Sequence, residues 1–276
     1  MALGYQIKRR LKIAARRLAA AGERQRVAGP CSRILTYHSV GDREHEMNVA
    51  PDAFRAQMEW LAEHAEVCPL AEAVEGARGV AITFDDGYRD NLAVAAPILA
   101  DAGLSASVFV VAGRVGMRLA HDRDIETGAL MTWEEILELE SMGWAVGAHS
   151  LTHRRLARLS RSEQRTEIRA CTRLLEDNLG HGIEAFAYPY GSELDFNQTT
   201  KTLVRECGYS FALSNRYGVN AAECDRWALR RIWIDRTDTQ ASFQAKVSGT
   251  LDALAWLDSP AAIRARRVVN SLLKTG

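Results

Sequence analysis

The feature that most constrains the fold is a regular alternation of short apolar runs with longer helical stretches between residues 31 and 240. Strands that alternate with helices form parallel βα units. So many units in one domain-sized block favour an α/β fold, and within it a closed or nearly closed (β/α) barrel over an open sheet. The expected strands are Ile34–Tyr37, Val80–Phe84, Ser107–Val111, Ala145–Ala148, Ala185–Tyr188, Tyr209–Leu213 and Leu229–Ile234.

Several expected helices carry boundary signals. Pro51 suits the first turn of a helix, and Thr132 with Glu135 forms a capping box ahead of a helix that Gly143 ends. Gly180 is the expected stop of a long helix that precedes it. Further helices are expected at Leu92–Ala102 and Thr200–Glu206.

Both ends of the chain are basic and amphipathic. Residues 1–18 contain no acidic residue, and the segment from Ile263 repeats this character. We expect a basic amphipathic helix in residues 1–30, the barrel in 31–240, and C-terminal helices in 241–276. These basic helices either pack on the barrel or form an interfacial anchor, because a basic amphipathic helix suits an anionic membrane leaflet.

Charge and cysteine content exclude several protein classes. Lys+Arg and Asp+Glu both total 35, so the molecule has no net attraction to nucleic acid. The 5 cysteines form no CxxC pair, which argues against a disulfide framework and a cysteine zinc site. No apolar run approaches the ~20 residues that span a bilayer, and the N-terminus lacks signal-peptide features. We therefore expect a cytoplasmic location, with peripheral contact on the inner membrane face as the alternative.

Two adjacent carboxylates, Asp85 and Asp86, follow the expected strand Val80–Phe84. Like charges this close raise each other's pKa, and a cation bound to one of them removes that cost. The other carboxylate can then accept a proton. Since Asp-Asp-Gly turns are common, this motif indicates a site only in combination with others.

Two histidines, His149 and His153, follow the expected strand Ala145–Ala148. Histidines four residues apart can converge on one ion, and with Asp86 they form a three-ligand set with open positions, which is typical of catalytic metal sites. Imidazole and carboxylate suit a divalent ion: we expect Zn²⁺, with Co²⁺ or Ni²⁺ as alternatives. A chain of this length does not need a structural metal to fold, so an ion here would serve chemistry.

A third strand end holds the segment Ala185-Phe-Ala-Tyr-Pro-Tyr-Gly191. Pro189 and Gly191 predict a turn that aims the backbone N–H of Tyr190 at an oxyanion. Taken alone, an aromatic-rich turn that closes a strand explains the segment equally well.

Three segments, in this order, resemble the motifs of the polysaccharide deacetylase family (carbohydrate esterase family 4, the NodB-homology domain): Thr83-Phe-Asp-Asp-Gly87, His149-Ser-Leu-Thr-His153 and Phe186-Ala-Tyr-Pro-Tyr-Gly191. The resemblance covers roughly residues 31–240. It implies a distorted (β/α) barrel, a divalent metal ion and hydrolysis of an N-acetyl group on a sugar.

The resemblance also implies residue roles. Asp85 would be the general base, Asp86, His149 and His153 would bind the metal ion, and Tyr190 would supply the backbone oxyanion contact.

The chain departs from the family pattern at two places. The Arg that stands two residues before the Pro of the third motif is Ala187 here, and Leu213-Ser-Asn215 stands roughly where the family has a late Leu-x-His segment with the catalytic acid. The segment Leu35-Thr-Tyr-His38 is similar to the opening of a subfamily that acts on secreted biofilm polysaccharides, in which the acid histidine has moved to the first strand. This similarity implies that His38 protonates the leaving amine.

For the missing Arg, the segment Leu229-Arg-Arg-Ile offers Arg231 or Arg230, and Arg231 better matches the late Arg-Ile pair of that subfamily. A guanidinium bonded to Asp85 would hold the pKa and the orientation of that carboxylate. The alternative is an edge-strand arginine that meets solvent. Three aromatic residues are expected to bind the substrate: Tyr88, Tyr188 and Trp233.

The expected function is metal-dependent N-deacetylation of an N-acetylated amino-sugar glycan. The substrate would be a polysaccharide or its lipid-linked precursor in exopolysaccharide or adhesin assembly. Two alternatives remain: a non-catalytic glycan-binding protein on the same fold, and a deformylase or amidase of another acylated amino sugar or small amide.

Overall fold

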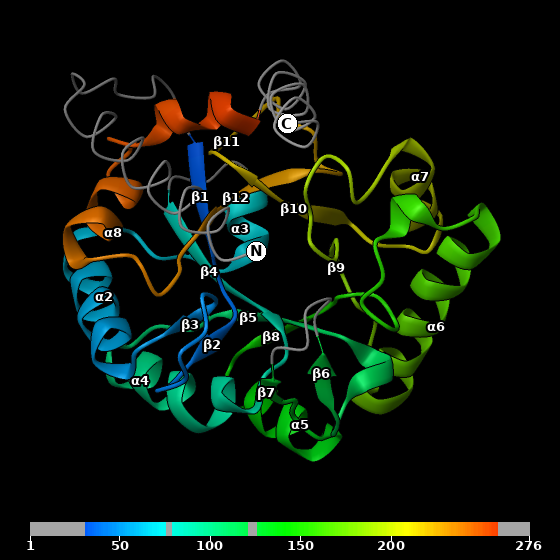
Figure 1. Ribbon diagram of the computed structural model, residues 1–276, viewed down its shortest axis with the longest axis horizontal. Helices are drawn as coiled ribbons and strands as arrows, with labels where there is room; N and C mark the ends of the chain where they lie inside the picture. The colour runs from blue at the N-terminus through cyan, green and yellow to red at the C-terminus, as the bar shows by residue number, and fades with distance from the viewer. Residues whose placement is uncertain (1–30, 76–78, 121–125, 259–276) are drawn as a thin grey trace, which may run out of the picture.

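The computed structural model describes residues 31–75, 79–120 and 126–258 (Figure 1). The basic segments expected as helices in residues 1–30 and beyond residue 258 lie outside this range. Within the described part of the chain, no helix has the length and apolar character needed to cross a bilayer.

The centre of the molecule is a closed barrel of parallel strands. Around the barrel the order is β1, β4, β5, β8, β9, β10 and β12, and β1 pairs with both β4 and β12 to close the ring. The expected (β/α) barrel is therefore confirmed. The short β11 (Asn220–Ala221) pairs antiparallel with the start of β1. The bounds of the barrel strands are Cys31–Tyr37 (β1), Gly79–Asp86 (β4), Ser107–Val110 (β5), Ala145–Ala148 (β8), Ala185–Ala187 (β9), Phe211–Tyr217 (β10) and Leu229–Trp233 (β12).

Helices surround this barrel (Figure 1). The longer ones are α2 (Pro51–His64), α5 (Trp133–Ser141), α6 (Arg161–Leu179), α7 (Gln198–Glu206) and α8 (Gln240–Val247), with the shorter α3 (Leu70–Val74) and α4 (Ala96–Asp101). Three 3₁₀ segments are Ala112–Arg114 (η2), Leu156–Arg158 (η3) and Asp252–Asp258 (η4). Two small pairs of strands lie outside the barrel: β2 (Ser39–Val40) with β3 (Asn48–Val49), and β6 (Arg118–Ala120) with β7 (Glu126–Ala129).

The boundary signals in the sequence correspond to observed caps. Thr132 and Glu135 form the capping box of α5, and Gly180 ends α6 in the left-handed conformation with a φ of 79°. Several elements begin or end at other residues than expected. The expected helix at Leu92–Ala102 opens as a π-helical turn, η1 (Asn91–Ala95), before it becomes α4. Strand β10 starts two residues later than expected, and the hydroxyl of Tyr209, which precedes the strand, bonds to Thr172 of α6 (2.7 Å).

Alternate residues of the strands divide the core into two parts. One part fills the barrel interior, where Phe109 lies against Gly147. The opposite faces of the strands pack under the helices, as Leu35 and Phe84 do. Because the strands are parallel, their C-terminal ends meet at one edge, where chemistry is found in barrels of this type.

Candidate active site

Three buried side chains that could hold a metal ion converge at this edge. Asp86 ends β4, His149 follows β8, and His153 lies four residues further along the chain. The Nε2 atoms of His149 and His153 are 3.5 and 3.3 Å from Oδ1 of Asp86. Ligand atoms placed tetrahedrally about 2.0–2.1 Å from Zn²⁺ are about 3.3 Å apart. The donor set and its spacing therefore fit a small divalent ion.

A backbone contact orients one of these histidines. Nδ1 of His149 donates to the carbonyl oxygen of Ala187, at 2.8 Å. Since a carbonyl only accepts, Nδ1 carries a proton, and Nε2 is the ring nitrogen that faces Asp86. At the position where the family pattern has an Arg, Ala187 thus contributes its main chain to the site.

The backbone is strained at this edge. Among the described residues, those other than Gly with positive φ are Asp86 (76°), Ser150 (62°), His153 (63°) and Tyr190 (61°). Such conformations cost free energy and concentrate at functional sites. Local hydrogen bonds hold the turn between the two histidines: Ser150 Oγ accepts from the N–H of His153 at 3.0 Å.

Asp85 is fully buried beside this cluster and forms a bidentate ion pair with Arg231. The Nη1–Oδ1 and Nη2–Oδ2 distances are 2.8 and 2.6 Å, and Nε of Arg231 donates to the carbonyl of Ser214 at 3.0 Å. Burial alone would raise the pKa of Asp85, but Arg231, then His149 and His38, lower it below its usual value. Asp85 is therefore ionised. The neighbouring Arg230 instead donates to the carbonyl of Tyr217.

His38 lies at the end of β1 on the same edge. Its side chain is buried, and its ring packs against that of Trp233 with 5.4 Å between centroids. It is near enough to Asp85 for its charge to lower the pKa of that carboxyl. The side-chain amide of Asn91 donates to the carbonyl oxygen of His38 at 2.8 Å.

The Tyr190 ring is held between two other side chains. Its centroid is 4.8 Å from that of His153, and the guanidinium of Arg155 lies 3.6 Å from the ring centroid. Arg155 is itself fixed by Asp195 at 2.5 Å. The sequence reasoning missed Arg155, Asp195 and Asn91, because no motif spacing distinguishes such supporting residues from ordinary polar surface residues.

The aromatic residues expected to bind substrate differ in position. Tyr188 is fully buried, stacks on Phe196 and donates its hydroxyl to the carbonyl of Trp227 at 2.9 Å. The Tyr188 ring therefore belongs to the hydrophobic core, and its expected contact with substrate stays a prediction. Trp233 is partly exposed beside His38.

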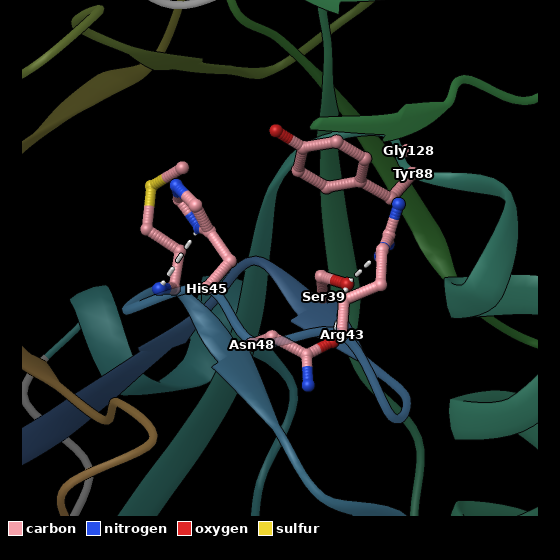
Figure 2. Close-up of a pocket in the computed structure, with 7 residues that line it drawn as sticks. Ser39, Arg43, His45, Asn48, Tyr88 and Gly128 are labelled. Atoms are coloured by element: carbon pink, nitrogen blue, oxygen red, sulfur yellow. Dashed lines mark hydrogen bonds between the residues drawn. The ribbon is translucent and has the colours of Figure 1, made fainter. Parts of the chain in front are cut away.

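Tyr88 lies on the wall of a small pocket next to the site. Figure 2 shows its ring above Ser39, with the Arg43 side chain running past Ser39 towards Gly128. The ring is 1% exposed, which leaves little surface for a glycan. A Cβ at Gly128 would overlap the Arg43 guanidinium, so the glycine leaves room for Arg43 in its present position.

Comparisons with known proteins agree with this architecture. Residues 73–212, half of the chain, match the sequence profile of the family described as Polysaccharide deacetylase. The Bacillus subtilis protein YxkH, which carries the name of this family, is 24% identical over 223 residues, or 78% of this chain and 75% of YxkH. The poly-β-1,6-N-acetyl-D-glucosamine N-deacetylase of Staphylococcus aureus is 24% identical over 218 residues, or 72% of each chain.

A solved structure shows the same fold. The Streptococcus pyogenes deacetylase PplD, in complex with acetate, superposes with a TM-score of 0.69 at 23% identity, over 79% of this chain and 98% of PplD. The fold, the family motifs and the matched profile lead to one assignment. The chain belongs to the polysaccharide deacetylase family and is a hydrolase that acts on amide bonds.

Proposed function

We propose that the protein is a metal-dependent N-deacetylase of an N-acetylated amino-sugar glycan. The observation that carries this proposal is the close grouping of Asp86, His149 and His153 beside a second, ionised carboxylate, Asp85. A carboxylate next to a three-ligand site matches the needs of amide hydrolysis, in which water must be both deprotonated and delivered to a carbonyl carbon.

Asp86, His149 and His153 would hold the ion, which we propose to be Zn²⁺, with Co²⁺ or Ni²⁺ as alternatives. When bound, such an ion lowers the pKa of water and polarises a carbonyl. The His149–Ala187 hydrogen bond supports this assignment, because a second contact that orients a histidine is a usual feature of metal sites.

The other roles belong to groups around this cluster. Asp85 takes the proton of the attacking water, since each of its oxygens keeps a lone pair while Arg231 binds both. The backbone N–H of Tyr190 donates to the oxyanion of the tetrahedral intermediate. His38 then gives its proton to the sugar nitrogen as the C–N bond breaks, which releases acetate and a free amine.

The substrate we propose is a glycan of N-acetylglucosamine type. The Staphylococcus aureus relative acts on poly-β-1,6-N-acetyl-D-glucosamine, and its similarity covers 72% of this chain. We further propose a lipid-linked precursor at the inner face of the membrane, in exopolysaccharide or adhesin assembly. The basic residues at both ends of the sequence support this, since they favour anionic lipid.

The test is acetate release from β-1,6-linked and β-1,4-linked N-acetylglucosamine oligomers, and from a lipid-linked oligomer. Wild-type protein should lose activity on chelation and regain it with Zn²⁺, whereas Asp85→Asn should bind the ion but release about 10²–10⁴-fold less acetate. Asp52→Asn, in the exposed first turn of α2, is the matched control and should behave as wild type. Ion binding without acetate release from any glycan would overturn the deacetylase proposal.

A further inference from the structure

The main chain of His38 lies at a break in the pairing of β1. Strand pairing stops at Tyr37 and resumes outside the barrel at Ser39, so the buried His38 carbonyl is outside both strands. A buried carbonyl needs a donor, and the side-chain amide of Asn91 supplies one at 2.8 Å. Asn91 is 0% exposed, so this amide has no access to solvent.

The neighbouring Asp90 binds the two residues that follow His38. Its Oδ2 accepts from the hydroxyl of Ser39 at 2.7 Å, and its Oδ1 accepts from the N–H of Val40 at 3.2 Å. Arg43 also pairs with Asp90. Its guanidinium donates to the hydroxyl of Ser39 at 2.6 Å (Figure 2). Three successive residues, beginning with His38, are therefore bound by two successive side chains.

Asp90 and Asn91 belong to the same short segment as Asp85 and Asp86. Asn91 begins the π-helical turn η1, and its N–H donates to the carbonyl of Tyr88 at 2.9 Å. Single π-helical turns within helices are often found at functional sites. One segment thus carries two side chains of the site, Asp85 and Asp86. Five residues further on it carries Asp90 and Asn91, whose hydrogen bonds to residues 38–40 we call the clamp.

We propose that Asn91, assisted by Asp90, is a positioning residue that fixes His38 relative to Asp85 for proton transfer to the leaving amine. This rests on the proposed function. Neither residue touches the reacting atoms; both act through the backbone of His38–Val40. Because proton transfer requires hydrogen-bond reach, a small displacement of His38 would reduce turnover more than substrate binding.

The first test is a double-mutant cycle on acetate release. Asn91→Leu keeps the branched shape and the number of heavy atoms of the side chain and removes the amide; we expect kcat to fall about 10–100-fold with KM within about twofold of wild type. In a His38→Ala background the same change should cost nothing further, because the residue it positions is gone. An equal loss in both backgrounds would mean a general structural role and overturn the proposal.

The matched control is Gln164→Leu. Gln164 of α6 is a buried amide that donates to the carbonyl of Leu159 at 3.0 Å and accepts from the hydroxyl of Thr200 of α7 at 2.7 Å. It should lower stability as Asn91→Leu does but leave kcat unchanged. If Asn91→Leu does not fold, Ser39→Ala removes the Ser39–Asp90 bond, together with the bonds of that hydroxyl to Arg43 and Asn48. Its kcat should fall about threefold, again only when His38 is present.

The second test does not depend on activity. The His38 and Trp233 rings, 5.4 Å apart, should give a nuclear Overhauser contact in the wild-type protein and in Gln164→Leu, and lose it in Asn91→Leu. An unchanged contact in Asn91→Leu would overturn positioning. A wild-type protein that releases no acetate would instead overturn the proposed function, while the ring contact would still report whether Asn91 places His38.

Discussion

At the scale of single residues, the pairing of Asp85 with Arg231 decides the charge of the site. Both side chains are fully buried, and burial raises the pKa of an isolated carboxyl. The bidentate contact with Arg231 outweighs the effect of burial, lowers the pKa of Asp85 and keeps it ionised. A buried pair of this kind is costly to break, because removing one partner leaves a buried charge.

We therefore predict that Arg231→Lys keeps the charge but impairs the site. Lysine cannot form the two parallel bonds to Asp85 or the bond to Ser214 at the same time. The free energy of unfolding should fall by about 1–3 kcal/mol in urea titration. The kcat for acetate release should fall by at least about tenfold.

Arg236→Lys is the control for this prediction. Arg236 lies on the loop after β12 with a side chain that is 44% exposed. The free energy of unfolding of Arg236→Lys should therefore stay within about 0.5 kcal/mol of the wild-type value. Wild-type turnover in Arg231→Lys would show that the bidentate geometry is dispensable.

At the scale of elements, the close packing of β8 against its neighbours requires a glycine, Gly147. A Cβ at Gly147 would overlap the Phe109 ring and lie 3.2 Å from the carbonyl of Ala185. Side chains two apart on a strand share a face, so Gly147 faces the same side as His149, which follows β8. The close approach of β8 to its neighbours thus places a predicted metal ligand.

Gly147→Ala should therefore destabilise the barrel and weaken metal binding together. Overpacking of this kind costs about 1–3 kcal/mol, and the displaced strand end should raise the Kd for Zn²⁺. Thermal unfolding and isothermal titration measure the two effects. Gly182→Ala, where a Cβ meets nothing within 4 Å, should change neither. Stability lost without any change in Kd would separate β8 packing from the metal site.

At the scale of the whole molecule, helix α8 is joined to the active-site edge. Lys246 of α8 is buried, and its Nζ donates to Asp238 at 2.6 Å and to the carbonyl of Trp233 at 2.5 Å. Phe243 of the same helix packs on Trp60 of α2 with 6.0 Å between ring centroids. Helix α8, at the start of the expected C-terminal segment, therefore packs on the barrel.

Lys246→Met should lower the free energy of unfolding by about 3–5 kcal/mol, because it removes the cation that faces the buried Asp238. Lys201→Met is the matched control. The pair of Lys201 with the half-exposed Asp225 should contribute about 0–1 kcal/mol to the free energy of unfolding. Chemical denaturation of both variants measures the difference. Equal losses would show that α8 does not depend on this ion pair.

Much of the fold follows from local sequence. The 145–148 strand, the capping box at Thr132 and Glu135 and the stop at Gly180 were readable because they depend on neighbouring residues alone. Alternation of strands and helices then predicted the barrel, and strand ends predicted where Asp86, His149 and His153 meet.

Tertiary structure alone decided the rest. Whether Arg230 or Arg231 reaches Asp85 depends on which side of β12 faces inward. Tyr188 lies in the core, where its ring stacks on Phe196. The clamp of Asn91 on His38 joins residues 53 apart in the chain. Sequence determined the elements and the order of the motifs, since these depend on local chemistry. Packing between distant segments determined which side chains meet, because a contact across a barrel has no local pattern that records it.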